Sequence, residues 1–341
     1  MKRTAAPFVF VAVCVLLGIV PSSAAAGTTE PDGVIAVSAG NQVEIIAPGT
    51  GAVTSFKAGP VGWLYPAPGG LLFAPDLIHG RTLVIDLKHL RSSGILKGVT
   101  MPHFGADVAD RYVTVAGDVM VFSYPERAEL ARVEAHILRP WQVVISKDWS
   151  TLFILERTPG MTAQPVLWII DLPNRDVLRK VPLDPGVTSM AFSRSLGVLA
   201  FADGSAGVRL SDPTTLVTIR RLQPGGRVND VTFTDEGTTL LAAVAHEHAG
   251  AVESYRLKFK RKGLHVSRRH AVELDAVPLR LAAAPGGTWA AAGTNGPGLS
   301  LFRIGHRGVV HTVPLPASPR DVEWCDANRR GPLLPAWSNL K

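Results

Sequence analysis

A short β-rich motif recurs along this chain at intervals of roughly 40 residues, and a fixed period of that length indicates repeated structural units. Each copy alternates apolar with other residues, as a strand with one buried face does, and some copies are followed by aspartate. The seven copies occupy residues 43–46, 83–86, 119–122, 167–171, 208–212, 252–255 and 299–302. The chain is therefore predicted to consist of seven similar β units.

A second recurring motif lies upstream of most copies and reads as a strand that ends in a Ser, Asp or Gly turn. Its clearest examples are residues 141–148, 188–193, 229–237 and 279–287. A small apolar strand follows the turn, as at 240–245 and 289–292. Each unit thus reads as four consecutive antiparallel strands joined by turns.

A four-stranded unit cannot cover both of its own faces, so it is stable only between neighbours, and a ring leaves only short edges open. The first unit, residues 33–59, lacks the first strand of a blade, whereas residues 319–324 resemble a first strand that is not followed by the other three strands. We therefore predict an all-β fold, a seven-bladed β-propeller of four-stranded antiparallel blades, closed by N- and C-terminal strands that share one blade. Residues 27–341 are expected to form this single domain.

The alternative is a β-sandwich or an array of small domains, which also have regularly spaced short strands. Roughly 27 strands exceed the 7 to 9 that a single sandwich uses. No Pro/Ser-rich linker divides the chain, and no stretch longer than about 12 residues keeps a helical apolar period. The ring is the better interpretation.

The units resemble those of bacterial YVTN-type and WD40-like propellers. The resemblance rests on prolines that open first strands, namely Pro102, Pro140, Pro278 and Pro319, and on Ser-x-Asp or Pro-Gly-Gly turns that close them. The Trp-Asp pair of strict WD40 repeats is absent. The resemblance therefore implies an architecture and no family function.

The N-terminus predicts export. Met1-Lys2-Arg3 is followed by an apolar run at 8–20 and by small residues up to Ala26, the three parts of a secretory signal peptide. The run is about 13 residues long and falls short of the roughly 20 that span a bilayer. We expect cleavage after Ala26 and a secreted or periplasmic protein. It would retain Cys325 without a disulfide partner.

The net charge is +7, of which Lys2 and Arg3 contribute two, so removal of residues 1–26 leaves +5. Seven cations lie close together at Arg256, Lys258, Lys260, Arg261, Lys262, Arg268 and Arg269. The segment from Lys258 to Lys262 is predicted to tip a hairpin of the sixth blade. It could bind an anionic polymer or be an ordinary solvated hairpin that resists edge pairing.

Loops between blades and between second and third strands should emerge together around one end of the central channel. That face would collect Asp76, His79, Arg81, His103, His136, Arg139, Glu156, Arg157, Asp203, Arg227, Asp230, His246, Glu247, His248, Arg280, Arg320 and Asp321. Among these, we expect contacts with a ligand from His103, Arg139, Arg227, Asp230, Arg280, Arg320 and Asp321. Mixed charge suits a polar ligand or a protein partner.

One local pattern suggests metal binding. His246 and His248 are two residues apart on an extended backbone, so both imidazoles point the same way and could hold a divalent transition metal. A complete site would need a third ligand. An exposed polar loop explains the same pattern, and no other cofactor is predicted.

The sequence lacks a Gly-x-Ser-x-Gly elbow, a haem-attachment motif, a phosphate-binding glycine loop and a dinucleotide fingerprint. We therefore expect a monomeric, non-catalytic binding propeller that recognises a protein or polar ligand through its channel-mouth loops. The alternative is a metal-assisted hydrolase or lactonase-like enzyme on the same scaffold, using His246, His248 and nearby carboxylates.

Overall fold

The computed structural model describes residues 33–76, 78–97, 101–104, 110–157, 164–234, 237–261, 263–284 and 286–326. The predicted signal peptide and Lys262 lie outside these residues. Every named element in the described part of the chain is a β-strand. Those residues contain no helix that is long and apolar enough to cross a bilayer.

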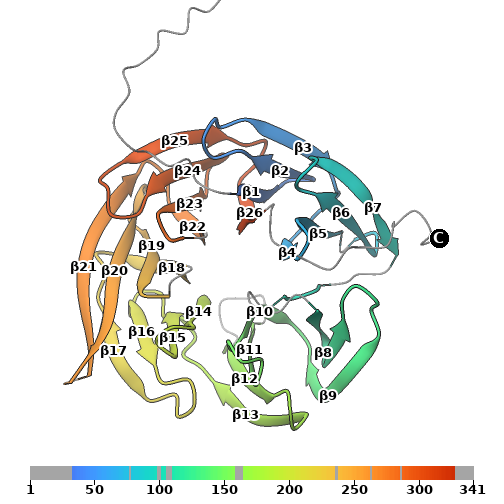
Figure 1. Ribbon diagram of the computed structural model, residues 1–341. Coiled ribbons are helices and arrows are strands. Elements are labelled where there is room, and N and C mark those ends of the chain that lie inside the picture. The colour runs from blue at the N-terminus through green and yellow to red at the C-terminus, as the bar shows by residue number, and fades with distance from the viewer. Residues whose placement is uncertain are drawn as a thin grey trace, which may run out of the picture. The chain divides into compact units, whose positions relative to one another are not determined.

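The strands form sheets arranged in a ring (Figure 1). Blade 1 contains β26 (Pro319–Cys325), β1 (Val34–Ala39), β2 (Gln42–Ile46) and β3 (Val53–Lys57). Blade 2 contains β4 (Tyr65–Ala67), β5 (Leu71–Asp76), β6 (Arg81–Asp86) and β7 (Arg91–Lys97). Blade 4 contains β10 (Pro140–Ile145), β11 (Thr151–Glu156), β12 (Val166–Asp171) and β13 (Asp176–Pro182).

The remaining four-stranded blades repeat this order. Blade 5 contains β14 (Ser189–Ser193), β15 (Val198–Ala202), β16 (Val208–Ser211) and β17 (Thr218–Leu222). Blade 6 contains β18 (Arg227–Phe233), β19 (Thr239–Ala245), β20 (Gly250–Lys260) and β21 (Gly263–Leu274). Blade 7 contains β22 (Pro278–Ala283), β23 (Trp289–Thr294), β24 (Gly298–Arg303) and β25 (Val309–Pro314).

Blade 3 is built differently. Its named strands are β8 (Arg111–Ser123) and β9 (Glu129–Ile137). Gly117 has a positive φ of 83° within β8, and the half that follows it pairs with β9. In the preceding half, Val113 forms an isolated antiparallel bridge to His103. The first strand of this blade is thus reduced to a single bridge directly after Pro102.

The two ends of the described chain close the ring, as the sequence predicted. β26 pairs antiparallel with β1, placing Cys325 opposite Val34 and Trp324 opposite Ile35. Gly33 enters this sheet with a positive φ of 93°, and a Cβ there would overlap the carbonyl oxygen of Cys325. Cys325 itself is buried and free.

The core consists of seven apolar clusters, and each lies between two adjacent blades. Alternate residues of one strand serve opposite clusters because side chains alternate across a sheet. In β1, Ile35 and Val37 face blade 7, whereas Ala36 faces blade 2. The repeated alternating motif in the sequence therefore reflects strands that are buried on both faces. Seven clusters for seven blades also show that the ring is closed.

Candidate binding site at the channel mouth

The innermost strands of all seven blades line one cavity of about 500 Å³ at the centre of the ring. Blades 1 to 7 each contribute at least one side chain, among them Asp321, Trp63, His103, Trp141, Met190, Asp230 and Arg280. Because the blades are antiparallel, the loops before each first strand and the loops between second and third strands share one end of this channel. We call that end the channel mouth.

Polar side chains inside the channel connect neighbouring blades. A carboxylate oxygen of Asp230 accepts a hydrogen bond from the Leu281 amide at 2.9 Å, and the other accepts one from the Ser189 hydroxyl. The Asp321 carboxylate accepts a hydrogen bond from the Leu64 amide at 2.8 Å. Asp230 and Asp321, both predicted as ligand contacts, are therefore held in place by backbone or hydroxyl donors of the adjacent blades.

Three carboxyl groups in the channel have raised pKa values. Burial, together with the nearby charge of Asp230, raises the pKa of Asp321 to about 6, although the Leu64 amide and Arg280 oppose the shift. Burial raises the pKa of Glu323 well above its usual range, and repulsion from Asp321 and Asp230 adds to this. Burial also raises the pKa of Asp230. The channel interior therefore carries less negative charge near neutral pH than its composition suggests.

A cluster of cations and indole rings lies at the mouth. The guanidinium carbon of Arg157 is 5.4 Å from the Trp141 ring centroid, and that of Arg280 is 5.3 Å from the same centroid. Trp63 meets Trp141 edge to face at 5.1 Å. The Trp141 indole nitrogen donates to the Thr188 carbonyl at 3.2 Å, which fixes the ring.

Electrostatics at this cluster are unbalanced. Burial lowers the pKa of Arg157, and repulsion from Arg280 and Arg227 lowers it further. Within the described part of the chain, neither Arg157 nor Arg227 forms an ion pair with a carboxylate, whereas Arg280 is attracted to Asp230 and Asp321. Three guanidinium groups from three blades thus converge with only partial compensation.

The other predicted contact residues lie in different settings. His103 lines the cavity, packs edge-on against Tyr65 at 4.9 Å, and is kept neutral because burial lowers its pKa to about 3. Arg139, Arg227 and Arg320 are exposed. Two of them accept hydrogen bonds through their backbone carbonyl oxygens. The Arg139 carbonyl accepts a hydrogen bond from the Arg157 amide at 3.2 Å, and the Arg320 carbonyl accepts one from the Arg280 side chain at 3.2 Å.

The turn of His246 and His248 lies at the same end of the channel but is highly exposed. The side chains of His248 and Glu247 are each 89% exposed and 3.8 Å apart. The described residues contain no group of three or more His, Cys, Asp or Glu side chains arranged to hold a metal ion. The metal site therefore stays a prediction.

Two carboxylates of the predicted face instead hold their own loops. Asp76 accepts hydrogen bonds from the amides of Ile78 and His79 and from the Arg81 side chain. Asp203 is buried and pairs with Arg209 at 2.9 Å and with Arg221 at 3.1 Å. These groups stiffen the loops between second and third strands.

The sequence interpretation did not include Trp63 or Trp141 among the candidates, and it placed Arg157 on the mouth face without expecting a ligand contact from it. One local signal was available, because Trp141 directly follows a proline that opens a first strand. A residue near the start of an innermost strand lies near the mouth once the ring is assumed. The pairing of Trp141 with Arg280 joins residues far apart in the chain and has no local signal.

Comparison with known proteins gives the fold. No family model matches the sequence, and no curated protein does. A Bacteroides fragilis protein considered a candidate 6-phosphogluconolactonase aligns with a TM-score of 0.62 at 14% identity, over 87% of this chain and 98% of that one. A chain of the mitotic checkpoint complex aligns with a TM-score of 0.63 at 13% identity, over 80% of this chain and 87% of that one.

A third solved structure is the Cps50 (Swd1) β-propeller domain of Myceliophthora thermophila. It aligns with a TM-score of 0.58 at 14% identity, covering 77% of this chain and 90% of that domain. At such identities the likeness extends to the fold alone. The chain is a seven-bladed β-propeller of WD40-like architecture.

Proposed function

We propose that this chain is an exported, non-catalytic binding propeller that holds an anionic polar ligand at its channel mouth. The ligand is either a small molecule or an acidic group on a partner protein. The observation that carries the proposal is that the guanidinium groups of Arg157 and Arg280 both lie over the Trp141 ring, with Arg227 nearby.

The chemistry of these groups suits an anion. Guanidinium groups bind carboxylate, phosphate and sulfonate through paired donors, and stacking on an indole orients the group before the ligand arrives. Arg157 lies in a partly desolvated position, where an incoming anion would interact more strongly than in bulk water. A bound anion would also relieve the repulsion among the three cations. The cavity of about 500 Å³ is in the size range of small-molecule sites.

Titration calorimetry with benzene trisulfonate tests the proposal, because this planar trianion stays ionised across the pH range of interest. Arg157→Gln should weaken binding by roughly tenfold or more, since each charge-assisted hydrogen bond contributes about 1.5–3 kcal/mol. Arg303→Gln is the matched control. The Arg303 guanidinium carbon also lies over an indole ring, 4.9 Å from the centroid of Trp289, but Arg303 is at the end of β24 that points away from the mouth. Unchanged binding by Arg157→Gln would refute the site.

A catalytic function is the second candidate. The likeness to the Bacteroides fragilis candidate 6-phosphogluconolactonase covers 98% of that chain, and the arginines of the mouth could hold a phosphate group. This function predicts hydrolysis of 6-phosphogluconolactone well above the spontaneous rate, together with its loss in Arg157→Gln. Saturable binding of a phosphorylated ligand without hydrolysis would favour the binding propeller.

Export is proposed from the N-terminal segment, which has the three parts of a signal peptide. N-terminal sequencing of the protein recovered from outside the cytoplasm should begin at Gly27. A chain that retains Met1 and stays in the cytoplasm would contradict export without affecting the proposed binding site.

A further inference from the structure

The hairpin between β20 and β21 is longer than its blade requires. β19 pairs with β20 only from Gly250 to Arg256, whereas β21 pairs with β20 as far as Lys260. Residues 257–260 and 263–266 therefore form a two-stranded extension, which we call the basic ribbon. Its free end projects outward from the ring near β17 (Figure 1).

The turn-forming aspartate that ends the third strand in two other blades is absent from this hairpin. In blades 2 and 4 the third strand ends at an aspartate, Asp86 or Asp171, whose carboxylate accepts backbone amides of the following turn. Register places Asp86 opposite Leu71, Asp171 opposite Thr151, and Arg256 opposite Thr239. Blade 6 has arginine where those blades have the turn-forming aspartate. Blade 7 also has arginine there, Arg303 opposite Trp289, yet β24 ends at that residue, so the missing aspartate permits the longer hairpin of blade 6 but does not require it.

The ribbon has two different faces, because side chains alternate along each strand. Leu257 is 1% exposed and Leu264 is 9% exposed, and both pack against the cluster between blades 5 and 6. Lys258 stands directly opposite His265 on the other face, and both are exposed. Phe259, opposite Leu264, lies near the free end and is 47% exposed.

Charge on the ribbon is of one sign. No acidic residue occurs from Arg256 to Val272. Within the described residues, Arg256, Lys258, Lys260 and Arg261 are exposed and make no ion pair. In blade 2, by contrast, one cation at the corresponding hairpin is paired, since Arg91 lies 3.5 Å from Asp86.

We propose that the basic ribbon docks this protein onto an anionic lipid surface. Lysine and arginine side chains attract anionic headgroups, and an exposed aromatic ring beside them can enter the boundary between headgroups and acyl chains. A soluble polyanion would need the cations alone and gives no role to Phe259. The combination of three exposed cations, Lys258, Lys260 and Arg261, with an exposed aromatic ring at a projecting end therefore favours the lipid surface.

Co-sedimentation with vesicles tests the proposal. Phosphatidylcholine vesicles containing about 30 mole per cent phosphatidylglycerol should retain the protein, whereas phosphatidylcholine alone should not. Lys258→Glu/Lys260→Glu should lower the partition coefficient by more than tenfold, since each charge near such a surface accounts for roughly fivefold. Phe259→Ser should cause a smaller loss that persists in high salt, because its contribution is apolar. Every protein tested begins at Gly27, as the exported chain is proposed to do, because the apolar run at 8–20 would itself bind lipid.

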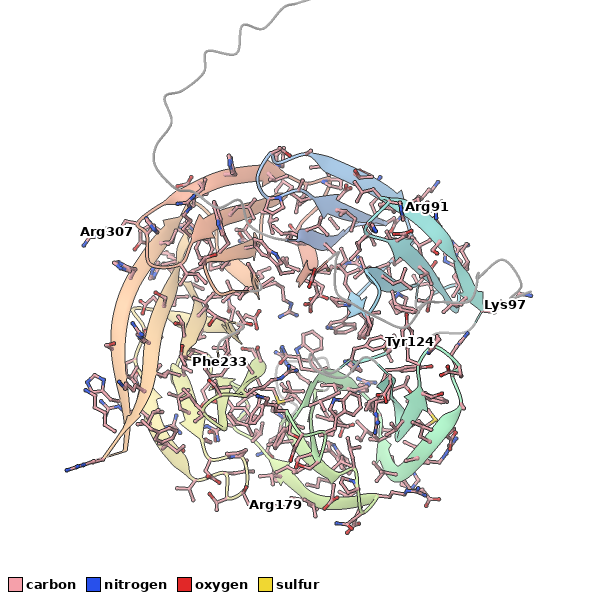
Figure 2. The ribbon with its side chains drawn as sticks, in the orientation of Figure 1. Arg91, Lys97, Tyr124, Arg179, Phe233 and Arg307 are labelled. Atoms are coloured by element: carbon pink, nitrogen blue, oxygen red, sulfur yellow. The ribbon has the colours of Figure 1, made fainter. Side chains whose placement is uncertain are left out.

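Lys88→Glu/Arg307→Glu is the matched control, because it changes the net charge equally at two other hairpins between third and fourth strands. Both residues are exposed, and Arg307 points outward from the ring (Figure 2). This control should bind anionic vesicles within about twofold of the unchanged chain. Equal binding by the ribbon variant, or an equal loss in the control, would overturn the proposal. So would binding to heparin but not to anionic vesicles, which would assign the ribbon to polyanions. Circular dichroism confirms that each variant is folded.

Discussion

The channel mouth and the basic ribbon are both positively charged, but they are built in opposite ways. The mouth arginines come from blades 4, 6 and 7: Arg157 and Arg280 both lie over the Trp141 ring, and the closed propeller brings Arg280 and Arg227 within repulsive range of Arg157. The ribbon cations come from one hairpin and are exposed to solvent. By topology the ribbon lies toward the other end of the channel, because hairpins between third and fourth strands emerge opposite the mouth loops. Charge assembled by the fold suits a specific ligand, whereas charge carried by one segment suits an extended surface.

The largest effect is expected at the mouth. Arg157→Gln/Arg280→Gln removes two charge-assisted contacts and should weaken benzene trisulfonate binding by roughly a hundredfold, from about 1.4 kcal/mol or more for each contact. Calorimetry measures this loss. Vesicle binding by the same double variant should be unchanged, and a parallel fall in both activities would show that the two regions are not independent.

The reverse experiment sharpens the comparison from the ribbon side. Lys258→Glu/Lys260→Glu should leave calorimetric binding of benzene trisulfonate within about twofold of the unchanged protein, because exposed charges beyond a Debye length are screened. A stronger effect would mean that net charge, and not the Trp141 cluster, controls binding at the mouth. The measurement is best made at physiological ionic strength.

Anion binding at the mouth should depend on pH. As pH falls from 8 to 5, Asp321, whose pKa is about 6, takes up a proton. Loss of its negative charge should strengthen benzene trisulfonate binding by roughly threefold to tenfold, as expected for one charge at a partly screened distance. Asp321→Asn should flatten this dependence. Affinity that stays constant across this range would place the bound anion away from the channel.

The smallest expected effect is on stability. The pKa of Glu323 is raised in the folded protein, so its ionisation costs free energy at high pH; the cost shrinks as pH falls below the folded pKa and vanishes only near the ordinary pKa of a glutamate. Glu323→Gln should therefore raise the free energy of unfolding at pH 8. The gain should shrink toward pH 5. Denaturant unfolding at the two pH values measures the difference, and a loss of stability at pH 8 would contradict the sign.

The architecture was predictable from the sequence because each blade is local. The strand motif at 208–212 and the turn residues between strands reflect contacts within one unit. The closing strand was also predictable, since residues 319–324 read as a first strand without a blade. Blade 3 shows the limit: the sequence predicted four strands, and the bend at Gly117 merges two of them into β8 while the first becomes one bridge at His103.

The site was only partly predictable, for a physical reason. Asp230, Arg280 and Asp321 were among the candidates because loops between blades were expected to gather at one end of the channel, and all three line the cavity. The contacts that these residues make could not be predicted. The hydrogen bond from the Leu64 amide to the Asp321 carboxylate, for example, joins residues near opposite ends of the chain. Arg157 reaches Trp141 within its own blade, from the loop after β11, but its proximity to Arg280 and Arg227 joins three blades. Spacing within one blade carries no information about which side chains of other blades it will meet.

A crystal structure of the protein with benzene trisulfonate tests the mouth most directly. Sulfonate oxygens should lie within hydrogen-bond distance of Arg157 and Arg280, with the benzene ring close to the indole of Trp141. Sulfonates bound only at exposed cations such as Lys258, with the mouth empty at saturating concentration, would contradict the proposed binding site.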